Sequence, residues 1–286
     1  GATSMAQGSW YEIVPTVPCS LSSLPTKTVI IVPMVVGGVS GCLETMEVAR
    51  AELAMHEKVG DGRTATVHRA VLRGTEVAVK EFNLPRVQMS KKEVQNLERE
   101  IELMKELRHP LIVNLLGVSV NNTMVRLVLD FCRGGHLFDL LHNNNEIDLV
   151  PQTQVQVLRD IAEAMAFLHA LTPRIVHRDL KSLNVLLAQP VASECDKVKV
   201  KLCDFGHARR IADDPGTVRV GTQHWMAPEV FMGHPYDHLA DVYSFAMVMF
   251  EVICREIPFE DMSASMAAIA AASGKRPDMA AIPPDC

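Results

Sequence analysis

The sequence predicts an α+β fold. Residues 51–82 alternate short apolar runs with turns, a pattern typical of consecutive β-strands. Residues 91–107 and 152–171 instead carry apolar side chains at spacings of three and four, which predicts two amphipathic helices. Because the chain has 286 residues and 48% of them are hydrophobic, it can bury a large core, in one big domain or in two lobes.

The overall charge and the cysteines narrow the function classes. The formal net charge is -6, so the chain lacks the basic footprint of a general nucleic-acid binder. Its seven cysteines contain no Cys-x-x-Cys pair and are odd in number, which favours reduced thiols over a disulfide framework or a zinc site. We therefore expect a cytoplasmic protein with no nucleic-acid partner.

The first 50 residues differ in composition from those that follow, and we expect an N-terminal extension, partly disordered or packed on the rest. Residues 29–39 form an apolar run, which is the only membrane candidate in the sequence. The run is shorter than the roughly 18 residues that indicate a span, and it contains Pro33. No basic region precedes a cleavage site, so a signal peptide is not expected. A strand or a poorly ordered extension is favoured over a membrane or partner contact.

The most informative stretch is residues 175–187, in which His-Arg-Asp-Leu-Lys-Ser-Leu-Asn stands between two apolar runs. An Asp and an Asn five positions apart suit phosphoryl transfer, which requires mainly placement and charge. Asp179 can accept the hydrogen bond of an incoming hydroxyl, and the amide oxygen of Asn184 can bind magnesium. Lys181 can reach the transferred phosphoryl group and offset its developing charge. The tripeptide His-Arg-Asp alone is also compatible with a chance loop sequence.

Two further motifs follow at defined distances. An Asp-Phe-Gly sequence begins at Asp204, directly after an apolar run and 25 residues beyond Asp179, where it can bridge magnesium to a triphosphate. Residues 209–220 are polar, as in a mobile loop, and they lead to an Ala-Pro-Glu sequence at residues 227–229. Each motif is common by chance, but their order and spacing argue against coincidence.

The sequence also predicts strands at residues 112–116 and 125–131 and a helix at residues 241–252. Because residues 241–252 are apolar on all sides, this helix is expected to be buried. The side chains expected to face inward from the first amphipathic helix are Val94, Leu97, Ile101, Met104 and Leu107. Those expected to face inward from the second are Val155, Leu158, Ile161, Met165 and Leu168.

Taken together, these motifs resemble those of the eukaryotic-type protein kinase domain, in the family's order and spacing from about Ala51 onward. The resemblance implies a two-lobed protein kinase fold. Residues 51–130 would form an N-lobe with a small antiparallel sheet and one helix, and residues 133–286 a larger, mainly helical C-lobe. Residues 276–286 look like the loop before the family's last two helices. The C-lobe is therefore expected to be incomplete, and Glu229 to lack its arginine partner.

The resemblance also implies a nucleotide site. Residues 60–67 resemble the glycine-rich loop Gly-x-Gly-x-x-Gly-x-Val, with Ala65 in place of the third glycine. A Gly-x-Gly alone most often marks a plain hairpin. The interpretation is strengthened by a Val-Ala-Val-Lys sequence that ends at Lys80. The resemblance implies that this lysine holds the phosphates of ATP. The residues expected to enclose the nucleotide are Val59, Gly60, Gly62, Val67, Ala78, Lys80, Leu129, Asp130, Cys132 and Leu186.

An acidic partner for Lys80 is expected on the first amphipathic helix. One Glu among several on a solvated face carries little information by itself. By alignment to the His109-Pro110 turn, the resemblance selects Glu100 rather than Glu98 or Glu102. The catalytic residues it implies are Lys80, Glu100, Asp179 and Lys181. The magnesium ligands it implies are Asn184 and Asp204.

The activity that the resemblance implies is transfer of the γ-phosphoryl of ATP, with Mg²⁺, to Ser or Thr hydroxyls of a protein substrate. Lys181 and the sequence from Thr222 to the Ala-Pro-Glu motif resemble the tyrosine-kinase-like group of serine/threonine kinases. Ala246, where that group usually has Gly, is a departure. Thr222 is expected to bond near Asp179 and Lys181 and to favour Ser or Thr over Tyr.

Regulation is expected on the segment that precedes the Ala-Pro-Glu motif. Thr217 is the expected acceptor for an upstream kinase, because Arg178 could dock its phosphate and order the segment. Cys132 and Cys203 lie near the predicted nucleotide pocket and are either reactive thiols or, as is usual for cysteines that line a pocket, inert packing.

Two alternatives stay open at this point. Ala65, Ala246 and the missing helices are compatible with a catalytically weak kinase fold that serves as a scaffold. Against this alternative, the set of residues expected for binding and catalysis is intact, namely Lys80, Glu100, Asp179, Asn184 and Asp204. The second alternative is a kinase with tyrosine or dual specificity. ATP binding without turnover would favour the first, and phosphotyrosine in the product the second.

Overall fold

The structure is a computed structural model that describes residues 47–62, 64–83, 88–120, 124–194, 196–211 and 221–282. All of them belong to the second of two separate units, Gly1–Cys42 and Leu43–Cys286. The apolar run at residues 29–39 and the expected phosphoacceptor Thr217 lie outside the described residues. Within the described part of the chain, no helix is long and apolar enough to cross a membrane.

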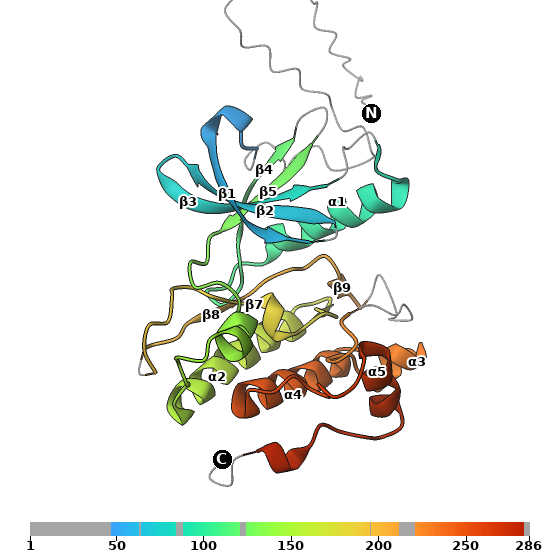
Figure 1. Ribbon diagram of the computed structural model, residues 1–286. Coiled ribbons are helices and arrows are strands. Elements are labelled where there is room, and N and C mark those ends of the chain that lie inside the picture. The colour runs from blue at the N-terminus through green and yellow to red at the C-terminus, as the bar shows by residue number, and fades with distance from the viewer. Residues whose placement is uncertain are drawn as a thin grey trace, which may run out of the picture. The chain divides into compact units, whose positions relative to one another are not determined.

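The N-terminal half of this unit is an antiparallel sheet of five strands in the order β1-β2-β3-β5-β4 (Figure 1). The strands are β1 (Leu53–Asp61), β2 (Ala65–Leu72), β3 (Thr75–Phe82), β4 (Leu115–Val120) and β5 (Val125–Asp130). The predicted strand at residues 112–116 was misplaced, since β4 begins only at Leu115. Ile112 and Val113 instead contact Leu202 through their backbones, because the larger lobe offers these residues a partner that periodicity cannot reveal.

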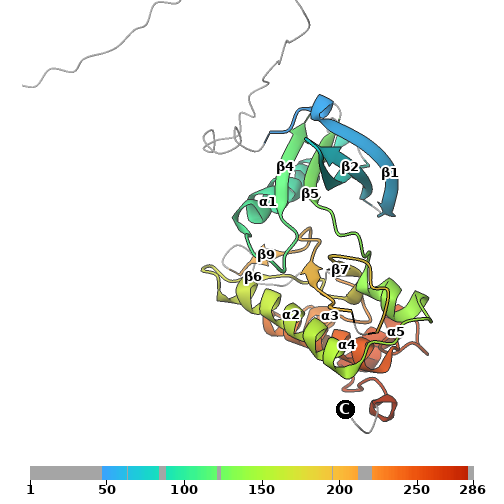
Figure 2. The ribbon, with the colours of Figure 1, turned by 90° about the vertical axis from the view of Figure 1, so that its left-hand side faces the viewer.

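The single long helix of this lobe, α1 (Lys91–Glu106), lies against the sheet (Figure 2). It begins at a capping box, in which the Ser90 hydroxyl accepts from the Glu93 N–H and the Glu93 carboxylate accepts from the Ser90 N–H. Leu97 and Met104 are buried as expected, whereas Val94 and Ile101 are only half-buried. The helix therefore turns its acidic position 100 toward the inside of the lobe together with its apolar stripe.

Residues just before β1 also pack on the sheet. Glu47 forms a bridge with Val118, and Val48 is buried in a small apolar cluster. The other buried members of that cluster are Leu53, Ala70, Val77, Val79 and Val128. The part of the expected extension that the structure describes is thus packed against the lobe.

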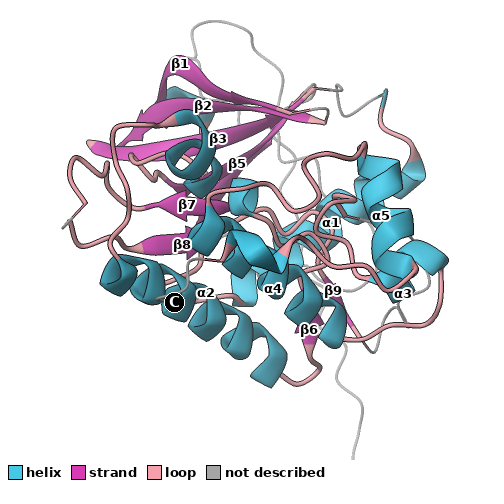
Figure 3. Ribbon diagram, turned by 60° about the horizontal axis from the view of Figure 1, so that its bottom comes forward, coloured by secondary structure: helices cyan, strands magenta, loops and turns pink. Residues whose placement is uncertain are grey.

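The C-terminal half is mainly helical, with α2 (Pro151–Ala170), α3 (Pro228–Met232), α4 (Leu239–Cys254) and α5 (Ala264–Ala272). Short antiparallel pairs lie above the helices, β6 (Ile175–Val176) with β9 (Arg209–Arg210) and β7 (Val185–Leu187) with β8 (Val200–Leu202). Figure 3 shows α3 and α5 side by side, in agreement with their contacts. A π-helical turn covers Asp139–Asn143, and 3₁₀ turns cover Arg50–Glu52, Ser182–Asn184 and Met279–Ala281.

Two predictions about burial were wrong. Val155 is 64% exposed, because the inward stripe of α2 runs through Val157, Ile161 and Leu168 at helical spacing. The helix α4 is not buried on all sides, since Val242 is 50% exposed. In both cases the apolar pattern fitted more than one helix face, and tertiary packing selected the face.

Candidate active site

The loop between β6 and β7 is anchored to helix α4 by one buried carboxylate. Asp241 accepts hydrogen bonds from the backbone N–H groups of His177 and Arg178, both at 2.9 Å, and lies 2.9 Å from Nε2 of His169. Arg178 has a φ of 70°, an uncommon conformation for a residue with a side chain. The two bonds to Asp241 hold the backbone there, directly before Asp179. Sequence reasoning gave Asp241 no role at the site, although this residue begins the apolar run at residues 241–252 and the Asp-Val-Tyr-Ser-Phe sequence that resembles the tyrosine-kinase-like group.

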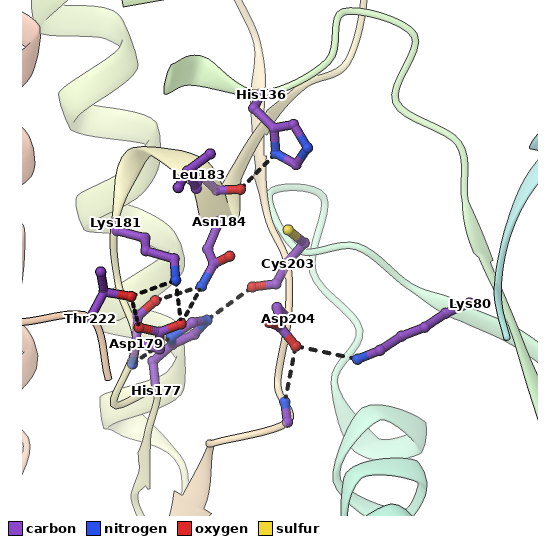
Figure 4. A network of polar contacts seen from close by, with 11 residues as sticks. Lys80, His136, His177, Asp179, Lys181, Leu183, Asn184, Cys203, Asp204 and Thr222 are labelled. Atoms are coloured by element: carbon purple, nitrogen blue, oxygen red, sulfur yellow. Dashed lines mark hydrogen bonds and ion pairs between the residues drawn. The ribbon is translucent and has the colours of Figure 1, made fainter. Parts of the chain in front are cut away.

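Asp179 is the centre of a compact group of polar contacts (Figure 4). The Lys181 ammonium donates to Asp179 Oδ2 at 2.8 Å and to the Thr222 hydroxyl oxygen at 2.6 Å. The Thr222 hydroxyl donates to Asp179 Oδ1 at 2.9 Å. Thr222 therefore lies where it was expected, beside Asp179 and Lys181. The three side chains fix a buried carboxylate next to a cation, which is an arrangement suited to receiving a hydroxyl and stabilising negative charge.

Asn184 lies on the other side of Asp179. Its Nδ2 donates to the Asp179 carbonyl oxygen at 2.7 Å and to Asp179 Oδ2 at 3.0 Å. Because the amide nitrogen faces Asp179, the amide oxygen points away from it (Figure 4). Among the residues that the structure describes, none donates a hydrogen bond to this oxygen. It is therefore free to act as a ligand of a hard cation.

Lys80 on β3 connects helix α1 to the Asp-Phe-Gly sequence. Its ammonium lies 2.7 Å from Glu100 Oε1 and 3.3 Å from Asp204 Oδ1, and both Lys80 and Glu100 are largely buried. Burial alone would lower the pKa of Lys80, but the attraction of Glu100 and then of Asp204 raises it above its usual value. The lysine is thus a fixed cation, and the choice of Glu100 over its neighbours agrees with this geometry.

Asp204 differs from Glu100 in being open to solvent on one side, with 43% of its side chain exposed. Burial acts to raise its pKa, but the Lys80 ammonium outweighs that effect and lowers the pKa of Asp204 to about 2. Gly206 allows the close approach of these groups. A Cβ there would lie 3.3 Å from Asp204 Oδ1 and 3.6 Å from Glu100 Oε2. Asp204 is therefore an anion at neutral pH and is partly exposed, and the N–H of the preceding residue, Cys203, donates to the Asn184 backbone carbonyl at 2.9 Å.

The residues expected to enclose a nucleotide fall on the sheet, on β7 and in two connections, the turn after β1 and the segment after β5. The strand register pairs Val67 with Lys80 and Ala78 with Leu129, so these four residues lie next to one another in the centre of the sheet. Leu186 comes from β7 and bridges to His136. The remaining expected residues occupy the first hairpin and the connection after β5, namely Val59, Gly60, Gly62, Asp130 and Cys132.

The connection after β5 is fixed by the side chain of Asp130. Its Oδ2 accepts from the Lys201 ammonium at 2.6 Å and from the Asn114 amide at 2.8 Å. The Asp130 N–H donates to the Asn114 carbonyl at 3.1 Å and is used internally. An adenine contact in this connection would then involve the Asp130 carbonyl and the backbone of Cys132.

The first hairpin is held by a residue that sequence reasoning missed. Asn83 donates from Nδ2 to the Gly62 carbonyl at 3.2 Å and from its N–H to the Thr64 carbonyl at 3.0 Å. The Thr66 hydroxyl donates to Asn83 Oδ1 at 3.0 Å. Ala65, at the place of the third glycine, is buried and begins β2. The turn is therefore tied to the end of β3.

Cys132 and Cys203 are expected to react slowly with iodoacetamide. Burial raises the pKa of Cys132 to about 11 and, with the Asp204 charge adding to it, raises the pKa of Cys203 still further. Because the thiolate is the nucleophile, we expect alkylation of Cys132 at pH 8 to be about 100-fold slower than in the unfolded chain. Peptide mass spectrometry with and without urea measures this ratio. Equal rates would contradict the raised pKa of Cys132, and only a faster rate in the folded protein would mean that this thiol is activated.

The comparisons with known proteins agree with this site. The protein kinase domain family matches residues 53–280. Mitogen-activated protein kinase kinase kinase 7 of Drosophila melanogaster is 35% identical over 221 residues, which cover 76% of this chain and 30% of that protein. In Arabidopsis thaliana, serine/threonine-protein kinase VIK is 36% identical over 242 residues, 82% of this chain and 53% of that protein. Serine/threonine-protein kinase CTR1 is 34% identical over 223 residues, 77% of this chain and 26% of that protein.

The chain thus spans between about a quarter and a half of the length of these relatives. The family match covers the sheet, the helix α1, the loop around Asp179 and the helices up to α5. Each of the three relatives carries a protein kinase name, and two are named serine/threonine-protein kinases. The chain therefore belongs to the protein kinase domain family and, within it, resembles the tyrosine-kinase-like group of serine/threonine kinases.

Proposed function

We propose that this chain transfers the γ-phosphoryl group of ATP to Ser or Thr hydroxyls of a protein substrate. The observation that carries the proposal is the hydrogen-bonded group of Asp179, Lys181 and Thr222. The predicted magnesium ligand Asn184 bonds Asp179 from the same loop. A second charged group, Lys80 with Glu100, supports it from the other lobe.

The donor atoms fit a nucleotide bound together with magnesium. Asp204 is anionic and partly exposed, and Asn184 directs its amide oxygen away from Asp179. Oxygen ligands of this kind are those that magnesium prefers. When bound, the metal would neutralise charge on the phosphates. Lys80 holds the phosphates, and Glu100 keeps its ammonium in place.

In the proposed reaction Asp179 accepts the hydrogen bond of the incoming hydroxyl and orients it toward the phosphorus. Lys181 bridges Asp179 and Thr222 and supplies a positive charge beside the transferred group. Thr222 donates to Asp179 Oδ1, and in the proposed reaction this contact favours an aliphatic Ser or Thr hydroxyl over the phenol of Tyr. The substrate is thus placed mainly by fixed charges and hydrogen bonds. Within the described residues, Cys132 and Cys203 form no disulfide, which supports a reducing, cytoplasmic location.

The test is transfer of radiolabelled phosphate from Mg-ATP to a generic mixture of protein substrates, followed by phosphoamino-acid analysis. We expect phosphoserine and phosphothreonine. Binding of ATP without any transfer would replace the proposal with a scaffold role, and phosphotyrosine would replace it with tyrosine or dual specificity. Phosphorylation of Thr217 by an upstream kinase stays a prediction. Mapping the labelled positions by mass spectrometry tests it.

A further inference from the structure

A completely buried carboxylate lies at the centre of the larger lobe, and the reaction proposed above gives it no role. Glu251 on helix α4 has an exposed fraction of 0%. Its Oε1 accepts from the Ser182 hydroxyl at 2.5 Å and lies 3.2 Å from Nε2 of His142. Its Oε2 accepts from the Trp225 indole N–H at 2.5 Å. Such a charge is costly to bury, and these donors from three separate segments compensate for it.

Two of the three segments carry the groups that surround the acceptor hydroxyl. Ser182 directly follows Lys181 in the loop that contains Asp179. Trp225 comes three residues after Thr222, whose hydroxyl donates to Asp179. The segment at residues 222–225 is therefore bonded to the catalytic loop twice, directly through Thr222 and indirectly through Trp225 and Glu251 (Figure 4 shows the first of these contacts).

A second bond from α4 reinforces the same connection. The Ser244 hydroxyl donates to the Trp225 carbonyl at 2.8 Å, so the helix holds both the backbone and the side chain of that residue. The donors on Glu251 approach both of its oxygens, and a carboxylate is the only side chain of this size that accepts on both sides. An apolar side chain at this position would leave an indole N–H and a serine hydroxyl buried without an acceptor.

We infer that Glu251 is a positioning residue for the phosphoryl-transfer reaction, which keeps the Thr222–Trp225 segment in register with the loop that bears Asp179 and Lys181. The inference rests on the proposed function. Glu251 does not touch the reacting atoms and acts through Ser182 and Trp225. Its loss is therefore expected to change the rate of transfer and the choice between Ser and Thr acceptors, and to leave the binding of ATP, which involves Lys80 and the sheet, nearly unchanged.

A mutant cycle tests the connection, with Glu251→Met, Trp225→Phe and the double variant. Glu251→Met is expected to lower kcat about tenfold, since a buried donor loses its acceptor, with less than a twofold change in KM for ATP. The double variant removes donor and acceptor together and is expected to be less impaired than the product of the two single effects. Glu251→Gln keeps one oxygen for the indole while the serine hydroxyl can turn to accept, so it should retain most activity.

Glu256→Met is the matched control, because Glu256 lies five residues further along and is exposed. The ratio of kcat/KM for a Ser peptide to that for the matching Thr peptide is measured in every variant. This ratio does not depend on the fraction of folded enzyme, and Glu251→Met should change it about threefold or more, while Glu256→Met should not. An unchanged ratio together with multiplicative effects in the cycle would reduce Glu251 to a purely structural group and overturn the inference.

Amide hydrogen exchange separates this outcome from failure of the proposed function. Glu251→Met should accelerate exchange in residues 179–184 and 222–227 together, with β1 to β5 unaffected, whether or not the chain is active. If the wild-type chain transfers no phosphate, the proposed function fails and the inferred role in transfer fails with it, while joint acceleration would still establish the physical link. If the wild type is active and neither segment responds, the inference alone is wrong.

Discussion

Replacing Asp179 with Asn is expected to reduce phosphoryl transfer by about 10²- to 10⁴-fold, the range associated with a positioned acid or base. The carboxylate accepts from Lys181, Thr222 and Asn184, and in the proposed reaction it also accepts from the incoming hydroxyl. An amide of the same shape accepts on one side only and would direct an N–H group at one of these donors. The measurement is single-turnover transfer of radiolabelled phosphate from Mg-ATP to a Ser peptide.

The affinity for ATP should change little in Asp179→Asn, because within the described part of the chain the Asp179 carboxylate bonds Lys181, Asn184 and Thr222 and contacts none of Lys80, Glu100 and Asp204. Asp139→Asn provides a matched control, since Asp139 is exposed and its carboxylate accepts from the Asn143 amide, away from the site. Retention of more than about a tenth of the wild-type rate by Asp179→Asn would contradict a role as the acceptor of the hydroxyl hydrogen bond.

The parts of the site that the sequence predicted are those encoded by short, ordered motifs. Asp179, Lys181 and Asn184 lie within six residues of one another, so their proximity follows from the chain itself. Asp204 was placed by its position directly after a strand-like run. Glu100 was a harder case, because its partner Lys80 is twenty residues away, and only the spacing to a turn identified it.

The buried anchors of the site could not be predicted in this way. Asp241 and Glu251 bond to residues 26 to 109 positions earlier, and they are the two carboxylates of the apolar helix α4. The local sequence pattern predicts that this helix is buried, but it does not predict which hydrogen-bond donors contact the two carboxylates. The same limit explains Val155, since periodicity alone allowed a face that packing did not select. Long-range partners decide such positions, and they are visible only once the elements are assembled.

Replacing Lys80 with Met is expected to damage both folding and catalysis. Glu100 is nearly inaccessible and would remain as an uncompensated charge, which costs about 3–5 kcal/mol when one partner of a buried pair is removed. Phosphoryl transfer should also fall by at least about 10²-fold, because the phosphates lose a fixed cation. Urea unfolding measures the first effect and transfer from Mg-ATP the second.

The double variant Lys80→Met/Glu100→Gln separates these two effects. Removing the charge of Glu100 should restore most of the free energy of unfolding, since no unpaired carboxylate is left inside, but it cannot replace the cation that faces the phosphates. Lys92→Met, an exposed lysine on the same helix as Glu100, controls for loss of charge and should behave as wild type. If the double variant regained transfer along with stability, Lys80 would serve only to neutralise Glu100, and its assignment to the phosphates would be wrong.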